Sequence, residues 1–369
     1  MRFLPEPPPS SLHPTRTGLL LVNLGTPDAP TASAVRRYLA EFLSDPRVVE
    51  IPRLVWLPIL YGLVLTLRPR DAAARYASVW TPEGSPLLAW SRRQAEALSR
   101  ALSDRGLVVE VALAMRYGNP SLEAAIASLR ETGCERILAL PLYPQYAAST
   151  TAAVSDAVGA CLARLRNVPE VRFVRDFHAD PGYIEAMAIR ILDFWRSNGR
   201  GRKLVLSFHG LPKRSIALGD PYHEQCLETG RLLAERLGLY AEQVEITFQS
   251  RFGAAEWLQP YTEPRLKELA KSGVSDVDVF CPGFVADCIE TLEEIAMQGK
   301  EAFLLAGGRQ LRYIDALNDS PAWIGALADL AERHMQGWTT RSEARQPADA
   351  AHSAVLLQRK NDKTPATDR

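Results

Sequence analysis

The sequence predicts an α/β protein made of two similar domains, each with a four-stranded parallel sheet flanked by helices. Eight short apolar runs alternate with longer helical patterns along the 369 residues. Several runs are nearly continuous Val, Ile and Leu, as in strands buried on both faces. The runs also fall into two sets of four whose ends carry the same turn motifs. Strand–helix alternation of this kind implies right-handed βαβ units in a parallel sheet.

The expected strands follow in order along the chain. The first set lies at 19–24, 107–115, 136–142 and 171–177, and the second lies at 203–208, 244–248, 277–281 and 302–306. Helical patterns such as 94–104 and 264–272 separate them.

The two sets match at three of their strand ends. The first strand of each set ends in a Gly-x-Pro turn, at 25–27 and 210–212. The second ends in an Arg-aromatic-Gly step, at 116–118 and 251–253. The third ends in a proline closely followed by an aromatic residue, at 141–143 and 282–284. One match means little, because Gly and Pro are common in turns. Three matches in the same order favour an internal duplication, with two similar doubly wound domains facing each other.

The domain boundaries follow from these sets and from composition. Residues 1–16 are rich in proline and 339–369 in small polar residues, so we expect both ends to be disordered. We expect an N-terminal domain at 17–150, carrying an insertion at about 30–88 and completed by the helix 310–338. A C-terminal domain is expected at 151–309.

Composition excludes several classes of protein. The chain has 43 Lys and Arg and 43 Asp and Glu, and a net charge of zero argues against a general nucleic-acid binder. Its five cysteines are scattered and form no CxxC pair, which argues against a structural zinc site and favours a reducing compartment such as the cytoplasm. No secretory h-region and no run of about 18 apolar residues is present.

The duplication helps to choose candidate site residues. Ligands of open α/β sheets bind beyond the carboxyl ends of the strands, so two facing domains place the expected site between them. Leu24 in the first half corresponds to His209 in the second. A histidine at this point is either a turn residue with a satisfied hydrogen bond or a proton acceptor or metal ligand in the cleft.

A second candidate is acidic. Asp287, Glu290 and Glu294 stand at i, i+3 and i+7 after a strand, so we expect them on one face of a helix. The helix macrodipole explains an acid in the first turn, but it explains Glu294 poorly. Hard oxygen ligands in a column suit a divalent metal ion in transit or a proton relay.

The insertion is the third candidate. Residues 54–61 are almost all apolar or aromatic, and four arginines, Arg53, Arg68, Arg70 and Arg75, flank or follow them. This pattern suits a large flat hydrophobic anion, an anionic membrane surface, or a buried helical hairpin with solvated ends. Neither a Gly-x-Gly-x-x-Gly nor a Walker A motif is present, and the Gly-x-Ser-x-Gly elbow is missing too. Nucleotide and acyl-transfer chemistry therefore lose their main support.

Taken together, these motifs resemble those of a known family. LLVNLGTP at 20–27, GSP at 84–86, MRY at 115–117, PLYPQ at 141–145, SFHGLP at 207–212 and GFVADCIETL at 283–292 are similar to those of ferrochelatases, over about residues 17–320. SVWTPEGSP at 78–86 resembles the proteobacterial branch, which uses protoporphyrin IX. The resemblance implies two Rossmann-like domains around a porphyrin cleft (the chelatase fold) and a lyase that inserts Fe²⁺ into protoporphyrin IX, the last step of haem biosynthesis.

The resemblance also implies roles for individual residues. His209 matches the family's cleft histidine and Glu290 the facing carboxylate, so these two are the expected catalytic pair and metal ligands. Asp287 and Glu294 match further acidic positions on a helix that contains a π-turn. The expected substrate-binding residues are Leu24, the pocket residues Arg116 and Tyr117, and the positions near the propionates, Arg68, Tyr76 and Ser85. The apolar insertion matches a lip that touches the membrane in some relatives.

Two departures from the family pattern stand out. Cys288 occupies a position where many relatives carry His, and Gln298 stands where some carry a further acid. Some ferrochelatases hold a [2Fe–2S] cluster through cysteines near the C-terminus, but no cysteine follows Cys288, so we expect no cluster and no other cofactor.

Alternatives remain open at this stage. The rivals are a tetrapyrrole or metal carrier without activity, a cobalt or nickel chelatase for another tetrapyrrole, and a nucleotide-dependent α/β enzyme. The expected partners are protoporphyrin IX and Fe²⁺, without nucleic acid. The expected location is cytoplasmic, with peripheral contact to the inner membrane as an open alternative. The sequence leaves the oligomeric state undetermined.

Overall fold

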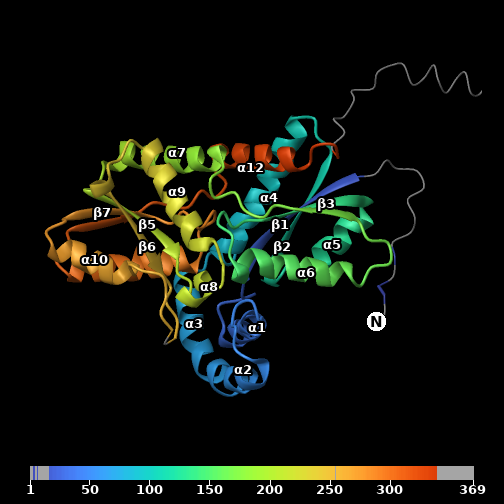
Figure 1. Cartoon of the computed structure of the whole chain (residues 1–369), viewed down its shortest axis with the longest axis horizontal. Coiled ribbons are helices and arrows are strands. Elements are labelled where there is room, and N and C mark those ends of the chain that lie inside the picture. Colours follow the sequence, from blue (N-terminus) through green and yellow to red (C-terminus); the bar gives the residue numbers. More distant parts are fainter. Residues whose placement is uncertain (1–2, 5, 7–15, 254, 339–369) are drawn as a thin grey trace, which may run out of the picture.

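Two parallel sheets with the same strand order form the centre of the molecule (Figure 1). The computed structural model describes residues 3–4, 6, 16–253 and 255–338. The first sheet has the order β2-β1-β3-β4 and the second the order β6-β5-β7-β8. The strands are β1 (Arg16–Thr26), β2 (Val109–Gly118), β3 (Cys134–Pro141), β4 (Glu170–Phe173), β5 (Lys203–His209), β6 (Val244–Gln249), β7 (Asp276–Phe280) and β8 (Gln310–Tyr313). The repeated order confirms the predicted pair of similar doubly wound units.

Helices cover both faces of each sheet, as a parallel sheet requires. The first half contains α1 (Ala32–Leu43), α2 (Arg53–Ile59), the π-helix η1 (Leu60–Val64), α3 (Leu65–Val79), α4 (Pro86–Asp104), α5 (Leu122–Glu131), the π-helix η2 (Ala148–Ala152) and α6 (Ala153–Leu162). The rest comprises α7 (Pro181–Asn198), α8 (Lys213–Ala217), α9 (Tyr222–Arg236), the 3₁₀ helix η3 (Ala241–Gln243), α10 (Thr262–Lys271), the π-helix η4 (Glu290–Gly299), α11 (Lys300–Leu305) and α12 (Pro321–His334).

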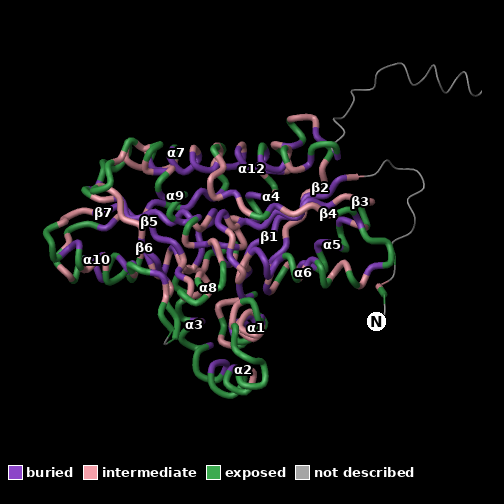
Figure 2. The backbone as a smooth tube through the Cα atoms, in the orientation of Figure 1, coloured by how far each residue is buried: buried purple, intermediate pink, exposed green. Residues whose placement is uncertain are grey.

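The hydrophobic core is continuous between the two halves. Residues 19–22 of β1 and 204–206 of β5 are fully buried, and Figure 2 shows both sheets as buried layers. One cluster joins β1 and β3 to β5 through α7, α9 and α12, while two smaller clusters lie under α5 and α6 and under α10 and α11. The shared core holds the carboxyl ends of both sheets in a fixed relation.

The boundary between the halves differs from the expected position at 150. Strand β4 pairs with β3, so the first sheet continues to Phe173. Helix α12 packs against α4 and β3 of the first half, while α7 packs against α9 of the second and against α12. Strand β8 pairs with β7, so residues 310–313 belong to the second sheet.

The eighth expected strand, at 302–306, is wrong. These residues lie in or just beyond α11, because Ala and Leu are strong helix formers and the segment continues the helix that starts at Glu290. Gly307, with φ +101°, ends the helix, and the short strand β8 follows.

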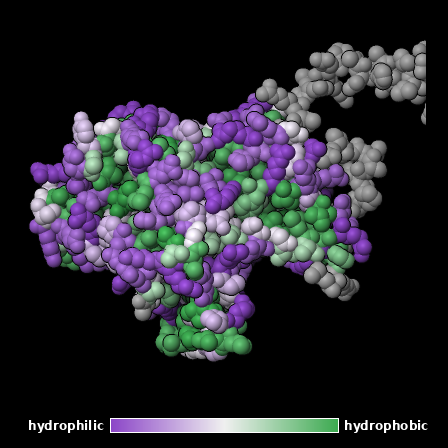
Figure 3. All heavy atoms as spheres, viewed as in Figure 1, coloured by the Kyte–Doolittle hydropathy of each residue, from purple (hydrophilic) through white to green (hydrophobic). Residues whose placement is uncertain are grey.

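The insertion folds as a helical protrusion below the sheets in Figure 1. Trp56, Leu60, Val64 and Leu65 form a small core of their own against α1. The Trp56 Nε1 donates to the Leu43 carbonyl at 2.6 Å. The outer face of residues 51–67, which we call the lip, stays exposed: Leu54 is 93% and Leu67 is 63% exposed, and Figure 3 shows a hydrophobic tip there. Among the described helices, none is long and apolar enough to cross a bilayer.

Part of the N-terminal segment contacts the body of the protein. Glu6 accepts hydrogen bonds from the backbone N–H groups of Arg166 and Asn167, at 2.8 and 3.0 Å, and pairs with Arg130. These bonds lower the pKa of Glu6. Disorder throughout 1–16 is therefore wrong for the described residues, which are Phe3, Leu4, Glu6 and Arg16, the first residue of β1. Residues 1–2, 5, 7–15 and the expected tail 339–369 lie outside the described part.

Candidate functional site

His209 is the last residue of β5 and is held by its neighbours on the backbone side. Its Nδ1 lies 2.7 Å from the carbonyl oxygen of Gly210, and Tyr222 donates to the His209 carbonyl at 2.9 Å. A carbonyl oxygen only accepts, so Nδ1 carries a proton and the neutral ring keeps its lone pair on Nε2. Gly210 is required here, because a Cβ would lie 2.8 Å from the Gln249 carbonyl.

Leu24 and His209 both lie in the neighbourhood of Phe284. The centroid of the His209 ring lies 6.4 Å from the centroid of the Phe284 ring and 6.4 Å from that of the Trp257 ring. Leu24 packs with Phe284 in a cluster that includes buried Leu87 and Cys288. The ends of the two central strands thus converge, as the duplication predicts. We call this region, with Glu290 and Tyr76, the junction.

Gln249 links His209 to Glu290. It pairs with His209 in the sheet register, and its Nε2 donates to the Glu290 carbonyl at 2.8 Å. Its Oε1 accepts from the Ser207 hydroxyl at 2.7 Å, so the amide orientation is fixed. Gln249 was not among the residues predicted from the sequence, although a buried amide at the end of the apolar strand β6 is a signal that points to it.

Helix η4 is a π-helix, as the resemblance implied, and it places two acids beside β6. Glu294 accepts from the backbone N–H of Ser250 at 2.6 Å and from the Ser250 hydroxyl. Gln249, which donates to Glu290, also lies 3.5 Å from a Glu294 oxygen. Glu290 and Glu294 therefore both border the end of β6, with His209 in the adjacent strand.

The expected stripe of Asp287, Glu290 and Glu294 is wrong in one member. Asp287 precedes the helix, so helical spacing does not apply to it. Its buried carboxylate accepts from the side chains of Thr291, Tyr313 and Asn318 at 3.0, 2.6 and 2.7 Å. Both of its oxygens accept hydrogen bonds from protein donors, which is the bonding of a structural carboxylate.

The predicted metal ligands do not form a single site. Within the described part of the chain, no three His, Cys, Asp or Glu side chains are grouped so that they could hold a metal ion. Asp287 and Glu294 are engaged by protein donors, which leaves His209 and Glu290 as the pair with the least committed side chains among the four.

Glu293 is a buried acid that the sequence analysis did not select. Burial raises its pKa, and the neighbouring charges of Glu294 and Glu290 raise it further, against the opposing effect of Arg75. The Gln298 Nε2 donates to Glu293 at 2.7 Å. Gln298, the departure noted in the sequence, therefore supports an acid of the same helix.

The insertion contributes aromatic side chains to the junction. Helix α3 packs against η4. Burial raises the pKa of Tyr76 and of Tyr38, and the charge of Glu290 raises both further. Tyr76 meets Tyr38 and Trp80 edge-on, at 6.5 and 6.4 Å between centroids. The phenols remain protonated beside the Glu290 carboxylate.

Arg68 and Ser85 lie in different surroundings. The Arg68 guanidinium sits 4.2 Å from the centroid of Phe252 and so connects the insertion to the second half. Ser85 is buried at the start of α4, next to Pro86 and two residues before Leu87 of the junction cluster.

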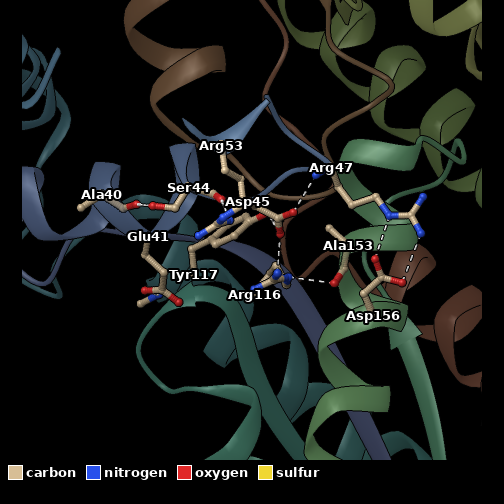
Figure 4. A network of polar contacts seen from close by, with 11 residues as sticks. Ala40, Glu41, Ser44, Asp45, Arg47, Arg53, Arg116, Tyr117, Ala153 and Asp156 are labelled. Carbon is tan, nitrogen blue, oxygen red and sulfur yellow. Dashed lines mark hydrogen bonds and ion pairs between the residues drawn. The ribbon is translucent and has the colours of Figure 1, made fainter. Parts of the chain in front are cut away.

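Arg116 and Tyr117 share a partner that the sequence analysis missed (Figure 4). The Asp45 carboxylate accepts from the Arg116 guanidinium and from the Tyr117 hydroxyl, the latter at 2.9 Å. Arg116 also donates to the Ala153 carbonyl at 2.8 Å and lies 4.4 Å from the Tyr117 ring centroid. Asp45 lies 71 residues before Arg116, so only the tertiary structure reveals the link.

A family model and the sequences of curated relatives point to the same family. A family model described as "Ferrochelatase" matches residues 16–335. A ferrochelatase of Bordetella pertussis is 62% identical over 347 residues, covering 92% of this chain and 96% of the relative, and one of Methylibium petroleiphilum is 59% identical, covering 97% and 98%. Among solved structures, a cobalt complex of the sirohydrochlorin chelatase SirB from Bacillus subtilis aligns with a TM-score of 0.49 at 12% identity, covering 88% of this chain and 97% of that chain.

The matched residues include every strand and helix described above. Identity near 60% over more than nine tenths of both chains is far above what fold similarity alone produces. This chain belongs to the ferrochelatase family.

Proposed function

We propose that this ferrochelatase, a lyase of haem biosynthesis that inserts Fe²⁺ into protoporphyrin, uses His209 as the base that removes pyrrole protons. The observation that carries the proposal is the bond from Nδ1 to the Gly210 carbonyl, which leaves the Nε2 lone pair free. A base must hold a lone pair within reach of the proton that it accepts. His209 ends the central strand of its sheet beside Phe284, where a flat ring can stack.

Glu290 is proposed as the partner of His209. Metal insertion releases two protons, so one imidazole is not sufficient. The Gln249 bridge fixes the backbone of Glu290 relative to β6, and the adjacent Glu294 offers a second carboxylate along the same helix. We assign Glu290 to the second proton and to the approach of Fe²⁺, and Glu294 to transfer toward solvent. Asp287 is left out of this path because it is buried and precedes η4, whereas Glu294 lies within the helix and is partly exposed.

The remaining predicted residues are assigned to porphyrin binding. Leu24, Phe284 and Tyr76 supply apolar and aromatic surface for the macrocycle. Arg116 and Tyr117 are assigned to the wall formed by the end of β2, and Arg68 to a propionate, since a guanidinium binds a carboxylate strongly. Contacts of Leu24, Phe284 and Tyr76 with the face of the macrocycle can hold the ring bent, so that pyrrole lone pairs point toward the metal.

One anaerobic assay tests the activity and the choice of substrate. The purified protein is mixed with protoporphyrin IX and Fe²⁺ or Zn²⁺, and the Soret and Q bands are followed. We expect metallation of protoporphyrin IX and slower metallation of coproporphyrin. Bound but unmetallated porphyrin would indicate a carrier, and turnover with Co²⁺ or Ni²⁺ on another tetrapyrrole would indicate a different chelatase.

We further propose that the enzyme contains no [2Fe–2S] cluster. Cluster ligation requires thiolates. All five cysteines lie in the described part of the chain, and no three His, Cys, Asp or Glu side chains are grouped there so that they could hold a metal centre. Iron analysis of protein purified without oxygen, together with the absorption spectrum, tests this: about two iron and two sulfide ions per chain would contradict it.

The lip is proposed to contact an anionic membrane surface while the enzyme remains cytoplasmic. Leu54, Leu63 and Leu67 are more than half exposed on one protruding tip, and arginines stand on both sides of it. Apolar side chains on a basic segment favour interfacial binding.

Flotation with vesicles of phosphatidylglycerol and phosphatidylethanolamine tests the lip. We expect co-flotation of the wild type and its loss in Leu54→Asp/Leu67→Asp. Leu305→Asp is the matched control, because Leu305 is 82% exposed on α11 and lies outside the lip. Equal flotation of all three proteins, or of none, would contradict the proposal.

A further inference from the structure

The base of the insertion is joined to the end of β2 by one buried carboxylate. Asp45 follows α1 and is buried; its side chain and that of Arg116 are 6% and 17% exposed. One carboxylate oxygen accepts from both the Arg116 guanidinium and the Tyr117 hydroxyl, and the other accepts from the backbone N–H of Arg47 at 2.8 Å. Figure 4 shows Asp45 between these three donors.

The Asp45 carboxylate therefore fixes two side chains that have few other hydrogen-bond partners. Arg116 has one further acceptor, the Ala153 carbonyl, among the contacts of the described residues. The Tyr117 ring lies under the guanidinium of Arg116 and edge-on to Phe42 of α1, at 5.1 Å between centroids. Burial raises the pKa of Tyr117, so its hydroxyl keeps the proton that it donates to Asp45.

A chain of aromatic rings connects this network to the junction. Phe42 stacks on Tyr38 at 5.9 Å, and Tyr38 meets Tyr76 edge-on at 6.5 Å. Tyr38 also donates to the Gly25 carbonyl, next to Leu24 at the end of β1. A shift of Tyr117 or of the end of α1 would therefore reach Tyr76, which is assigned above to the porphyrin surface, because these contacts are close-packed.

We infer that Asp45 is a positioning residue for the porphyrin, which acts by holding Arg116 and Tyr117 in the wall of the binding site. This inference rests on the proposed assignment of Arg116 and Tyr117 to that wall. Wall contacts act on the macrocycle before and during metal insertion alike, so their loss changes the KM for porphyrin and leaves kcat nearly unchanged. A purely architectural carboxylate would instead lower stability and the active fraction.

Steady-state metallation of protoporphyrin IX by Zn²⁺, with thermal melting of each variant, tests the inference. For Asp45→Asn we expect the porphyrin KM to rise about tenfold and kcat to stay within about threefold. Asp45→Glu keeps the charge on a longer side chain, and we expect a KM raised about threefold. Asp156→Asn is the matched control: Asp156 binds the side chain of Arg47 at the surface and contacts neither Arg116 nor Tyr117.

A double-mutant cycle separates this inference from the assignment on which it rests. Arg116→Gln should raise the porphyrin KM by itself, and adding Asp45→Asn to it should change KM by less than about twofold, since the two residues act together. If Arg116→Gln raises KM and Asp45→Asn does not, the role of Asp45 is overturned and the wall stands. If neither changes KM, both are overturned. Full additivity, or a folded Asp45→Glu variant with wild-type KM, also overturns the inference.

Discussion

A substitution of Asp287 distinguishes between a structural role of this carboxylate and a role as a metal ligand. Its carboxylate accepts hydrogen bonds from Thr291, Tyr313 and Asn318 in a buried site. In Asp287→Asn one acceptor oxygen becomes an N–H donor, so at least one of these donors faces another donor. A hydrogen bond to a charged group contributes about 1.5–3 kcal/mol, and a buried donor left without a partner costs a further 1–3 kcal/mol or so.

We therefore expect Asp287→Asn to lose about 3 kcal/mol of unfolding free energy, which lowers Tm by about 4 °C in a protein of this size. Differential scanning calorimetry measures the loss, and Zn²⁺ insertion assayed well below Tm should give a metal KM within about threefold of wild type. Asp319→Asn, an exposed neighbour, is the control. Unchanged Tm together with a metal KM raised more than about tenfold would refute the reasoning, because it would make Asp287 a ligand.

Two further predictions concern the same region. The pKa of Glu293 is raised in the folded protein, so ionisation of this side chain destabilises the fold above that pKa, and the penalty disappears as the pH falls below the ordinary value of 4.5. Glu293→Gln should therefore raise Tm at pH 8 and not at pH 4. A gain in Tm of equal size at both pH values, or an equal gain in the exposed control Glu301→Gln, would contradict this prediction. Gln249→Leu removes the donor to the Glu290 carbonyl and should lower kcat about 10–100-fold, with the porphyrin KM nearly unchanged. The control Gln259→Leu, at the surface, should have no effect. A kcat within about twofold of wild type in Gln249→Leu would mean that the hydrogen bond from Gln249 does not position Glu290.

The strand ends could be predicted from the sequence because turns impose strong local requirements. The glycine at position 25 has φ +110°, and a Cβ there would lie 1.8 Å from the Tyr117 carbonyl oxygen. Gly210 in the second half is similarly confined by the Gln249 carbonyl. Such requirements recur in a duplicated chain, so matching motifs identified both sheets and placed Leu24 and His209 at corresponding strand ends.

Other features depend on tertiary structure and were missed or misplaced. The 302–306 segment is apolar enough for a strand, but its Ala and Leu residues continue a helix, and the true strand β8 is too short and mixed to stand out. The spacing of Asp287 from Glu290 indicated one helical face, although the helix starts after Asp287. Asp45 and Gln249 have no local motif, because their partners lie far away in sequence.

The most direct test of the account is the rate of metal insertion in a single turnover by His209→Ala. Protoporphyrin IX is bound first, Fe²⁺ is added without oxygen, and the Soret band is followed by stopped flow. We expect porphyrin affinity within about threefold of wild type and an insertion rate at least about 100-fold lower, the usual contribution of a positioned base. Insertion within a factor of about three of the wild-type rate, at unchanged porphyrin affinity, would contradict the assignment of His209 as the base.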